Sequence, residues 1–380
     1  MRVLQICAAY KPAYIYGGPT MSVSMLSEQL VIAGFDTAVY ATTANGVSEL
    51  PVEPGVPTKL DGVTVTYFSR ITKDHTHFSP ALIKTLWQEL PNYSLVHIHA
   101  WWNMVSVLSC LIALVRKVPV LLSPRGTLSP YSFQNRNIGP KWLLHQVIGR
   151  FLLTNCNIHV TSAREGAATI RLFKPKSITL LPNFVKLDFQ KPVQQNSPPP
   201  LFRLLFFSRI EEKKGLDVLI GALAGLTFPF HLTIAGDGEK DYIDSLKKIA
   251  ENKQVDNKIT WTGFIDQDKF EFLSRHDIFI LPSHDENFGN AVIESLSVGT
   301  AVLISEQVGL AEYVKKKKLG WICQTTVSSV AGMLNNIAVK QNAELYRIRN
   351  EAPPIIFAGF KEENLVKEYI NMYKKLLEND

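Results

Sequence analysis

The stretch Ser283-His284-Asp285-Glu286-Asn287-Phe288-Gly289-Asn290-Ala291-Val292-Ile293-Glu294 places two glutamates, Glu286 and Glu294, eight positions apart. A glycine follows the first carboxylate, and the second lies inside an apolar run. This pattern predicts a strand, a turn and a helix, with Glu286 in the turn and Glu294 two helical turns further on. The two carboxylates then lie roughly 12 Å apart, at about 1.5 Å of rise per residue.

The backbone between the two carboxylates is suited to an anion. The amides of Asn287, Phe288, Gly289 and Asn290 lie at a predicted helix start, where N–H groups have no partner within the helix. A carboxylate at each end of a phosphate site suits a ligand with hydroxyls on both sides of a diphosphate. A sugar nucleotide is such a ligand.

Length and composition favour a folded protein of two domains. The chain has 380 residues, of which 46% are hydrophobic, and its formal net charge is +6. The Lys and Arg residues are scattered, so the charge fits attraction to anionic substrates or to an anionic lipid surface. It does not call for nucleic acid as a partner.

The cysteines and apolar runs bear on the cellular compartment. Four cysteines, far apart and without metal-ligand spacing, are expected to be buried free thiols in a reducing compartment: Cys7, Cys110, Cys156 and Cys323. The run Val3–Ala9 is too short for a secretory signal and predicts a first strand. The longest apolar run, Val105–Val115, falls short of the ~20 residues that cross a bilayer. We therefore expect a cytoplasmic protein, with any membrane contact peripheral at the inner face.

Short apolar runs alternate with amphipathic segments in the first half of the chain, which is typical of parallel sheets covered by helices. Strands are predicted at Arg2–Ala8, Thr37–Thr42, Val63–Phe68, Leu95–His99, Val118–Leu122, Ile158–Val160 and Ile178–Leu181. Helices are predicted at Thr20–Ala33, Pro80–Leu90, Val105–Arg116, Lys141–Leu153 and Ala163–Leu172.

The polar, proline-rich stretch Lys191–Pro200 predicts a linker, after which the alternation restarts. Strands are predicted at Arg203–Phe207, His231–Ala235, Lys258–Thr262, Ile278–Leu281, Ala301–Ile304 and Trp321–Cys323. Helices are predicted at Leu216–Leu226, Lys240–Asn252, Gln267–Ser274, Asn290–Val298 and Glu362–Leu377. The sequence thus predicts an α/β protein of two doubly wound Rossmann-like domains facing across a cleft, where ligands bind beyond the carboxyl ends of the strands. Residues 1–188, with helix 360–380 crossing back, form the first domain, and residues 189–359 form the second.

Arg209 and Lys214 follow a predicted strand on one loop. Two cations at the carboxyl end of a strand can hold a diphosphate, Arg209 with two parallel hydrogen bonds and Lys214 as a point charge. A solvated charged loop is the alternative, because Glu211 and Glu212 lie beside them.

Three glycine-bearing turns also follow predicted strands. Gly17-Gly18-Pro19-Thr20 allows close backbone approach to a ligand. It is not G-x-G-x-x-G, and no acidic residue ends the second strand, which argues against a dinucleotide cofactor. Gly236-Asp237-Gly238 and Thr262-Gly263-Phe264 can line the same ligand site, with Phe264 over a base. Ordinary strand-to-helix turns are the alternative for all three.

His97 and His99 end the fourth predicted strand on the same face of the sheet. We expect His99 to reach the reaction centre and His97 to be a buried structural residue. Trp101 either stacks on a sugar ring or packs in the core. Arg125 faces a phosphate or makes a surface salt bridge.

Two charged segments have two interpretations each. Asp266-Gln267-Asp268 resembles an aspartate pair that binds a divalent metal in some glycosyltransferases, but helix N-capping explains it more simply. The run Lys315–Lys318 is expected to end a helix, where cations suit the helix dipole. A membrane-surface patch is the alternative for these lysines.

Taken together, these motifs resemble the retaining glycosyltransferases of family 4, which have the GT-B fold. The resemblance covers essentially the whole chain, in the order Gly17-Gly18, His99, Arg209 with Lys214-Gly215, Gly236-Asp237-Gly238, Thr262-Gly263-Phe264, Glu286 to Glu294, and Gly299. Ser123-Pro124-Arg125-Gly126 is similar to a variant found among bacterial surface-polysaccharide transferases.

The resemblance implies roles for the matching residues in the second half. Glu286 binds hydroxyls of the donor sugar, and Glu294 holds the ribose hydroxyls. Asn287, Phe288, Gly289, Asn290 and Gly236 line the diphosphate site, Phe264 covers the base, and Arg209 and Lys214 neutralise the leaving diphosphate. The family often has a Gly-Gly pair before a glutamate where this chain has Val308-Gly309-Leu310-Ala311-Glu312, which puts donor contacts there in question.

The resemblance also implies roles in the first half. Gly17 and Gly18 approach the diphosphate, and His99 lies near the anomeric carbon. We expect Tyr16, Trp101 and Arg125 to contact the acceptor.

The resulting expectation is a retaining transfer of a sugar from a nucleoside diphosphate sugar, most simply a UDP-sugar. The acceptor is a hydroxyl of a saccharide or a polyprenyl-linked saccharide, in polysaccharide biosynthesis. Family members usually need no metal, and we expect no separate cofactor. A sugar-nucleotide epimerase on the same fold and a non-catalytic nucleotide-sugar-binding subunit remain as alternatives. Retention of both Glu286 and Lys214 argues against the binding subunit.

Overall fold

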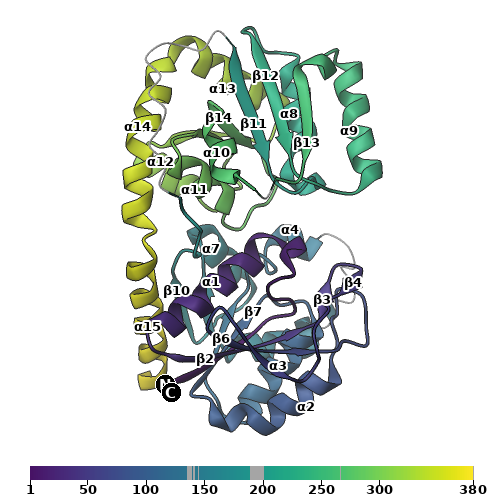
Figure 1. Ribbon diagram of the computed structural model, residues 1–380, viewed down its shortest axis with the longest axis vertical. Coiled ribbons are helices and arrows are strands. Elements are labelled where there is room, and N and C mark those ends of the chain that lie inside the picture. The colour runs from purple at the N-terminus through teal and green to yellow at the C-terminus, as the bar shows by residue number, and fades with distance from the viewer. Residues whose placement is uncertain (135–138, 140–141, 144, 189–200, 266, 380) are drawn as a thin grey trace. The chain divides into compact units, whose positions relative to one another are not determined.

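The computed structural model describes residues 1–134, 139, 142–143, 145–188, 201–265 and 267–379 (Figure 1). The chain divides into two compact units. Unit 1 comprises residues 1–185 and 360–380, and unit 2 comprises residues 186–359. The predicted linker Lys191–Pro200 lies outside the described residues.

Unit 1 alternates strands with helices. Its strands are β1 (Arg2–Ile6), β2 (Asp36–Thr42), β3 (Ala44–Asn45), β4 (Ser48–Glu49), β5 (Pro57–Leu60), β6 (Val63–Phe68), β7 (Leu95–His99), β8 (Val120–Ser123), β9 (Asn157–Val160) and β10 (Ser177–Leu180). Its helices are α1 (Gly18–Ile32), α2 (Pro80–Glu89), α3 (Met104–Val115), α4 (Pro130–Gln134), α6 (Arg150–Thr154), α7 (Ala163–Leu172) and α15 (Glu362–Asn379).

The main sheet of unit 1 has the order β10-β9-β8-β7-β1-β2-β6-β5. Its strands run parallel except β5, which pairs antiparallel with β6 at the edge. The chain begins in the middle, builds outward through β2 and β6, and then returns to the other side of β1 at β7. The strand order therefore reverses between β1 and β7, the position where doubly wound sheets bind ligands.

Helix α15 packs beside α1 in unit 1 although unit 2 separates the two in sequence (Figure 1). Its buried side chains recur at helical spacing on one face: Leu365, Val366, Tyr369, Met372, Tyr373 and Leu376. They join Val3, Leu26, Leu30 and Leu121 in one hydrophobic cluster. Each fully buried side chain of this size contributes about 2 kcal/mol, so α15 is an integral part of unit 1.

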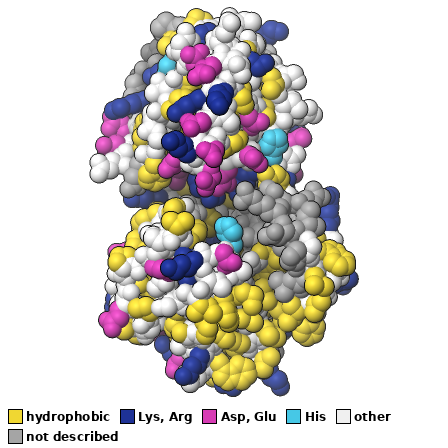
Figure 2. Space-filling model, turned by 90° about the vertical axis from the view of Figure 1, so that its right-hand side faces the viewer, with side chains coloured by type: hydrophobic (Ala, Val, Ile, Leu, Met, Phe, Trp, Pro, Cys, Tyr) yellow, Lys and Arg dark blue, Asp and Glu magenta, His cyan; other side chains and the backbone are white. Residues whose placement is uncertain are grey.

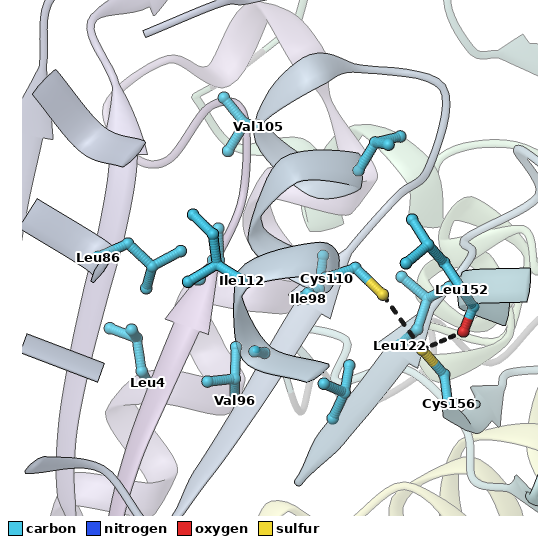
Figure 3. Close-up of a cluster of buried hydrophobic side chains, with 14 of the residues drawn as sticks. Leu4, Leu86, Val96, Ile98, Val105, Cys110, Ile112, Leu122, Leu152 and Cys156 are labelled. Carbon is cyan, nitrogen blue, oxygen red and sulfur yellow. Dashed lines mark hydrogen bonds between the residues drawn. The ribbon is translucent and has the colours of Figure 1, made fainter. Parts of the chain in front are cut away.

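A second hydrophobic cluster lies beneath α2, α3 and α6 on another part of the sheet, while other hydrophobic side chains of unit 1 remain at the surface (Figure 2). Figure 3 shows Leu86, Val96, Ile112 and Leu122 in this cluster. Cys110 and Cys156 also belong to it, with their sulfur atoms 3.3 Å apart as free thiols. All four cysteines are buried and free, as predicted.

Unit 2 follows the same plan. Its strands are β11 (Phe202–Phe207), β12 (Phe230–Ala235), β13 (Ile259–Gly263), β14 (Ile278–Leu281), β15 (Ala301–Ser305) and β16 (Gly320–Cys323). Its helices are α8 (Leu216–Leu223), α9 (Lys240–Asn252), α10 (Lys269–Ser274), α11 (Asn290–Ser297), α12 (Ala311–Lys317), α13 (Val327–Lys340) and α14 (Asn342–Gly359).

The sheet of unit 2 has the order β13-β12-β11-β14-β15-β16, with all neighbours parallel. Numbered from β11, this is the 3-2-1-4-5-6 order of a dinucleotide-binding sheet. The strand order reverses between β11 and β14, so the loops that follow these two strands meet at the ligand-binding edge. The predicted α/β class with two doubly wound Rossmann-like units is confirmed.

Several predicted elements differ from the structure. The predicted helix Lys141–Leu153 is wrong as one element, because a π-helical turn spans His145–Gly149 before α6 begins at Arg150. Helix α14 was not predicted, since Pro353 and Pro354 lie inside it. The lysine run Lys315–Lys318 does end a helix, as predicted: α12 ends at Lys317, and Lys318 follows with a φ of 55°.

Candidate active site

In unit 2, the loops after β11 and β14 bring the two predicted segments together. Lys214, in a 3-10 turn at Glu212–Lys214, forms an ion pair with Glu286. The two side chains are only 8% and 19% exposed. The His284 amide donates to the Lys213 carbonyl at 2.8 Å, which ties the backbones of the two loops together. The two predicted segments therefore meet in one ion pair at the β11–β14 reversal.

Glycines make the close packing of these loops possible. A Cβ on Gly215 would lie 2.1 Å from the Pro282 carbonyl oxygen, and a Cβ on Gly236 would lie 1.8 Å from the Ser208 carbonyl oxygen. Both glycines also have positive φ angles, of 68° and 147°. Any other residue at position 215 would push the loop of Arg209 and Lys214 away from Pro282. Any other residue at position 236 would push it away from the loop after β12.

The charges on these loops are balanced locally. Burial would raise the pKa of Glu286, but Lys214 first, and then Lys213 and Arg209, hold it below its ordinary value. Arg209 contacts Glu211 at 2.8 Å, and the pKa of Glu211 is likewise lowered against the effect of its burial. Both carboxylates are therefore ionised at neutral pH, and each holds a cation that an incoming anion can also contact.

Helix α11 begins at Asn290, with Gly289 at its N-cap in a left-handed conformation of φ 98° and no capping side chain. The expectation of two full helical turns between Glu286 and Glu294 is wrong, because Glu286 lies four residues before the helix starts. Glu294 lies just over one turn into α11, where it pairs with Lys269 at 2.8 Å. The helix start predicted after Glu286 is present, since α11 begins at Asn290.

The departure from the family pattern at Val308 has a structural counterpart. The Gly309 amide donates to the Glu286 carbonyl at 2.8 Å, and the Glu286 amide donates to the Gln307 carbonyl at 3.2 Å. Val308 is buried and lies against the position that a Cβ on Gly289 would occupy, at 3.2 Å. The segment 307–309 therefore holds the backbone of Glu286 in place, with Val308 filling the space beneath Gly289.

The remaining predicted residues of unit 2 lie at varied positions. Phe288 is buried, so only its backbone can face a ligand. Phe264 is 68% exposed just beyond β13, as a side chain that covers a base must be. Asp268 occupies the N-cap of α10 with a φ of 54°, and its side chain makes no capping hydrogen bond, so the capping prediction is wrong for it. Asp266 lies outside the described residues. Within the described part of the chain, no three His, Cys, Asp or Glu residues group as metal ligands.

In unit 1, the glycine turn after β1 leads directly into α1. Gly17 has a φ of 70° and is the N-cap, and α1 starts at Gly18 with Pro19 in its first turn. Tyr16 accepts a hydrogen bond from the Gly46 amide at 3.0 Å through its hydroxyl. This bond ties the glycine turn to the β3–β4 hairpin.

His99 ends β7 and is 2% exposed. Its Nδ1 accepts from Nε of Arg125 at 3.2 Å, so its Nε2 carries the proton and donates to Oε1 of Gln5 at 2.7 Å. Nη1 of Arg125 donates to Asn183 at 2.9 Å. Both ring nitrogens of His99 are thus engaged, and the arrangement fixes the direction of the Arg125 side chain.

The hydrogen bonds continue from Gln5 through the core of unit 1. Gln5 donates to the Tyr373 hydroxyl at 3.2 Å, and this hydroxyl donates to Nδ1 of His97 at 2.8 Å. Nε2 of His97 then donates to Ser123 at 2.6 Å, and Ser123 donates to Nδ1 of His159 at 2.6 Å.

His159 completes this histidine chain by donating through Nε2 to the Leu181 carbonyl at 3.0 Å. Along this chain each hydroxyl, amide and imidazole both donates and accepts, and Nε2 of His159 also lies 3.1 Å from the Tyr369 hydroxyl, which donates to the Pro182 carbonyl. This pattern requires all three imidazoles to be neutral, with the proton on Nε2. His97 is a buried structural residue, as expected.

Burial is the main cause that lowers the pKa of all three histidines, and the charge of Arg125 lowers each of them further. The pKa of His159 falls to about 3. The unfolded chain binds protons at these histidines below about pH 6.5, whereas the folded chain does not. The stability that the neutral rings contribute is therefore fully present above pH 6.5. It is lost progressively as the pH falls from 6.5 toward the lowered pKa of the folded state. Each ring contributes up to about 1.4 kcal/mol per pH unit to this slope.

We expect His159→Gln to reduce the slope of the unfolding free energy against pH between pH 6 and pH 5. The reduction should be about 1.4 kcal/mol per pH unit, which corresponds to one proton. Denaturant unfolding at several pH values measures the slope. His75→Gln, at an exposed position, is the matched control and should leave it unchanged. An unaltered slope in His159→Gln would contradict a neutral buried ring.

The prediction that Trp101 contacts the acceptor is wrong. Its side chain is fully buried in the hydrophobic cluster beneath α3, so it has no face to offer to a ligand. Arg125 is half-buried, with a left-handed backbone of φ 52°. It forms no salt bridge among the described residues, so the salt-bridge alternative does not hold. Sequence reasoning also missed Ser123, His159 and the tyrosines of α15, whose only signal was their polar character within buried elements.

Comparison with known proteins places this geometry in a family. Residues 16–189 match the model of Glycosyltransferase Family 4, and residues 189–353 match that of Glycosyl transferases group 1. A glycogen synthase of Mycobacterium tuberculosis is 26% identical over 360 residues, covering 85% of this chain and 82% of that one. An uncharacterized glycosyltransferase of Methanocaldococcus jannaschii is 27% identical over 198 residues, covering 51% of this chain. This match spans only 49% of the archaeal protein, about half its length.

Solved structures agree in fold. Sucrose-phosphate synthase of Thermosynechococcus elongatus has a TM-score of 0.77 at 19% identity, with both chains fully covered. HepE of Anabaena, solved with UDP and glucose, has a TM-score of 0.75 at 18% identity, covering 99% of this chain and 100% of that one. The two family models together account for residues 16–353. The chain therefore belongs to glycosyltransferase family 4 and has the GT-B fold.

Proposed function

We propose that the protein transfers a glycosyl group from a nucleoside diphosphate sugar to an acceptor hydroxyl, with retention of anomeric configuration. The Lys214–Glu286 ion pair at the β11–β14 reversal supports this proposal most directly. It combines a cation for the diphosphate with a carboxylate for sugar hydroxyls at the edge where such sheets bind nucleotides. UDP is the proposed nucleotide, since HepE of Anabaena was solved with UDP and with UDP-glucose.

The chemistry requires stabilisation of the departing diphosphate. As the glycosidic bond breaks, negative charge accumulates on the leaving oxygen. Lys214, Arg209 and the N–H groups at the start of α11 stabilise that charge more in the transition state than in the ground state. The leaving oxygen takes the proton of the acceptor hydroxyl on the same face of the sugar. No side chain then needs to act as nucleophile, and no metal or separate cofactor is needed.

Unit 1 supplies the acceptor contacts in this proposal. Arg125, aimed by His99 and Asn183, contacts an anionic or hydroxyl-rich acceptor, and Tyr16 lines the same region. His99 acts as a positioning residue, because both of its ring nitrogens are engaged. A saccharide or polyprenyl-linked saccharide in polysaccharide biosynthesis fits these groups.

Product analysis tests the proposal. A thermal-shift screen against nucleoside diphosphates and their sugars first identifies the donor, because a ligand at 100 times its dissociation constant adds about 2.7 kcal/mol. Incubation with donor alone should give only slow hydrolysis, and transfer should require an acceptor. Epimerised donor without acceptor would contradict a transferase and favour the epimerase.

We expect Glu294→Ala to weaken nucleotide binding more than it slows bound-state turnover. Glu294 is proposed to hold the ribose hydroxyls, and it lies away from the leaving oxygen on the second turn of α11. Titration calorimetry with the diphosphate measures the affinity. Lys269→Ala, which removes the partner of Glu294 but not the carboxylate, is the control and should bind more tightly than Glu294→Ala. Unchanged affinity in Glu294→Ala would count against the ribose contact.

We expect transfer activity to survive a chelator. Lys214 and Arg209 supply the positive charge that a divalent ion supplies in metal-dependent transferases. Initial rates with and without EDTA, after removal of free metal, give the answer. Strong inhibition that added Mg²⁺ or Mn²⁺ reverses would restore Asp266 and Asp268 as candidate ligands.

A further inference from the structure

Three helical elements of unit 1 share one layer: α2, α3 and a third segment, residues 142–143 and 145–154, that contains α6. Each of them directly precedes one of the strands β7, β8 and β9, which are neighbours in the sheet. Helices that precede parallel strands end at the amino edge of the sheet, so their last turns lie side by side. Contacts of α3 with both α2 and α6 agree with this arrangement. We call the solvent side of this layer the outer face.

Large hydrophobic side chains are exposed on the outer face. They are Trp87 on α2, Val115 on α3, and Trp142, Leu143, Val147 and Phe151 on the third segment, with exposures of 46% to 73%. Figure 2 shows hydrophobic side chains crowded over part of unit 1, where few charged side chains interrupt them. An open groove between α2 and α3, of about 530 Å³, adds Phe78, Ile83 and Leu108 to the apolar surface. Exposed apolar surface of this extent marks an interaction site.

The charges of this region are almost entirely positive. Between residues 75 and 164 the sequence has eight Lys and Arg residues and one acidic residue, Glu89, a net charge of +7, whereas the whole chain carries +6. Four of these cations are exposed on or beside the outer face: Lys84, Arg116, Lys117 and Arg150. The Arg116 guanidinium lies over the Trp87 ring at 5.3 Å, so cation and aromatic ring form one surface.

We propose that the outer face docks unit 1 on an anionic lipid bilayer. Exposed Trp, Phe and aliphatic side chains insert into the headgroup boundary, and the surrounding cations contact lipid phosphates. Within the described residues, no helix is long and apolar enough to span a bilayer, so attachment through this face is peripheral. A protein partner would more commonly meet mixed charges, whereas this surface offers cations with one carboxylate among them.

Most of the outer face lies away from the residues of unit 1 that are proposed to bind the acceptor. The glycine turn, His99 and Arg125 lie at the carboxyl edge of the unit 1 sheet, and the last turns of α2, α3 and α6 lie at the amino edge. A bilayer that contacts these last turns therefore does not cover the residues of unit 1 proposed to bind the acceptor, while Trp142 and Leu143, at the start of the third segment, lie nearer that edge. The inference does not depend on the proposed transfer reaction, and vesicle binding tests it without a substrate.

Co-sedimentation with vesicles tests the docking surface. The full chain should bind phosphatidylcholine vesicles that contain phosphatidylglycerol, bind pure phosphatidylcholine much more weakly, and dissociate as salt rises. Tryptophan emission should shift to shorter wavelength on binding, because Trp87 and Trp142 enter the boundary. Absence of binding to anionic vesicles, or binding that salt and lipid charge do not affect, would overturn the proposal.

Two triple variants separate the contributions of charge and apolar surface. Arg116→Gln/Lys117→Gln/Arg150→Gln should lose about 100-fold in vesicle affinity, at roughly fivefold per cation. Trp87→Ser/Val147→Ser/Phe151→Ser should lose a similar factor. All six positions are exposed, so circular dichroism and thermal unfolding should match the original protein.

Matched controls lie elsewhere on the chain. Ile32→Ser and Val339→Ser remove exposed apolar side chains outside the outer face and should keep full binding. Lys315→Gln/Lys316→Gln/Lys317→Gln tests the rival basic patch on α12 and should also bind normally. Loss of binding in the α12 variant with retention in the outer-face variants would assign the membrane contact to unit 2. Self-association that only the outer-face variants abolish, without vesicle binding, would assign the surface to a second copy of the chain.

Discussion

Replacing Glu286 with alanine will lower turnover by at least about 100-fold, the scale of losing one oriented polar group at a reaction centre. The carboxylate is ionised, mostly enclosed and held by Lys214, and its backbone is fixed by Gln307 and Gly309. A group so restrained can orient a sugar hydroxyl without further ordering. Initial rates of transfer at saturating donor measure the loss.

Glu306→Ala is the matched control for Glu286→Ala. Glu306 is an exposed glutamate just beyond β15 on the same edge of the sheet, and its loss should leave the rate within a factor of about two. Circular dichroism separates a chemical effect from unfolding, since Glu286→Ala leaves Lys214 without its partner. A folded Glu286→Ala protein with near-normal transfer would refute the assigned role.

Replacing Lys214 with alanine will reduce turnover by about 100- to 1,000-fold, with a larger effect on kcat than on KM. Lys214 is 8% exposed, so water screens its charge little, and the diphosphate acquires most of its negative charge as the bond breaks. The lost cation thus matters most in the transition state.

The neighbouring lysine provides a sharp comparison. Lys213 lies on the same turn, is 34% exposed and contacts Glu211 at 3.4 Å. Lys213→Ala should therefore cost far less than Lys214→Ala, although both remove one positive charge from the same loop. Equal losses in the two variants would show that the loop acts through its net charge, and would contradict a specific contact of Lys214 with the leaving group.

The sequence revealed most of unit 2 but not the pairing within it. Alternating apolar runs predict the strands, and the spacing of Glu286, Glu294 and Lys214 points to the site. The contact of Lys214 with Glu286 depends on β11 and β14 being neighbours, and strand order is a property of the whole sheet. Helix α14 was not predicted, because Pro353 and Pro354 disfavour a helix locally. Tertiary contacts, including that of Arg349 with Asp277 at 3.3 Å, hold the helix despite them.

Unit 1 shows a different limit of sequence reasoning. His99 was correctly placed at the carboxyl end of a strand, but the residues bonded to it directly or through Gln5 come from three other parts of the chain that are separated widely in sequence. Gln5 lies on β1, Arg125 follows β8, and Tyr373 lies on α15, so no local pattern connects them. For Trp101 the sequence allowed both packing and an acceptor contact, because a tryptophan next to a strand end looks the same in sequence whether it is buried or exposed, and the structure shows packing.

The position of α15 bears on how the protein is made. A ribosome releases residues 186–359 before it releases residues 360–380, so unit 2 can finish folding while the first 185 residues still lack a helix that belongs to them. Until then the hydrophobic side chains of unit 1 that pack against Tyr369 and Tyr373 stay uncovered. His97 also lacks the Tyr373 hydroxyl as its hydrogen-bond partner. A recombinant fragment ending near residue 185 would lack α15 altogether, whereas residues 186–359 include every element of unit 2.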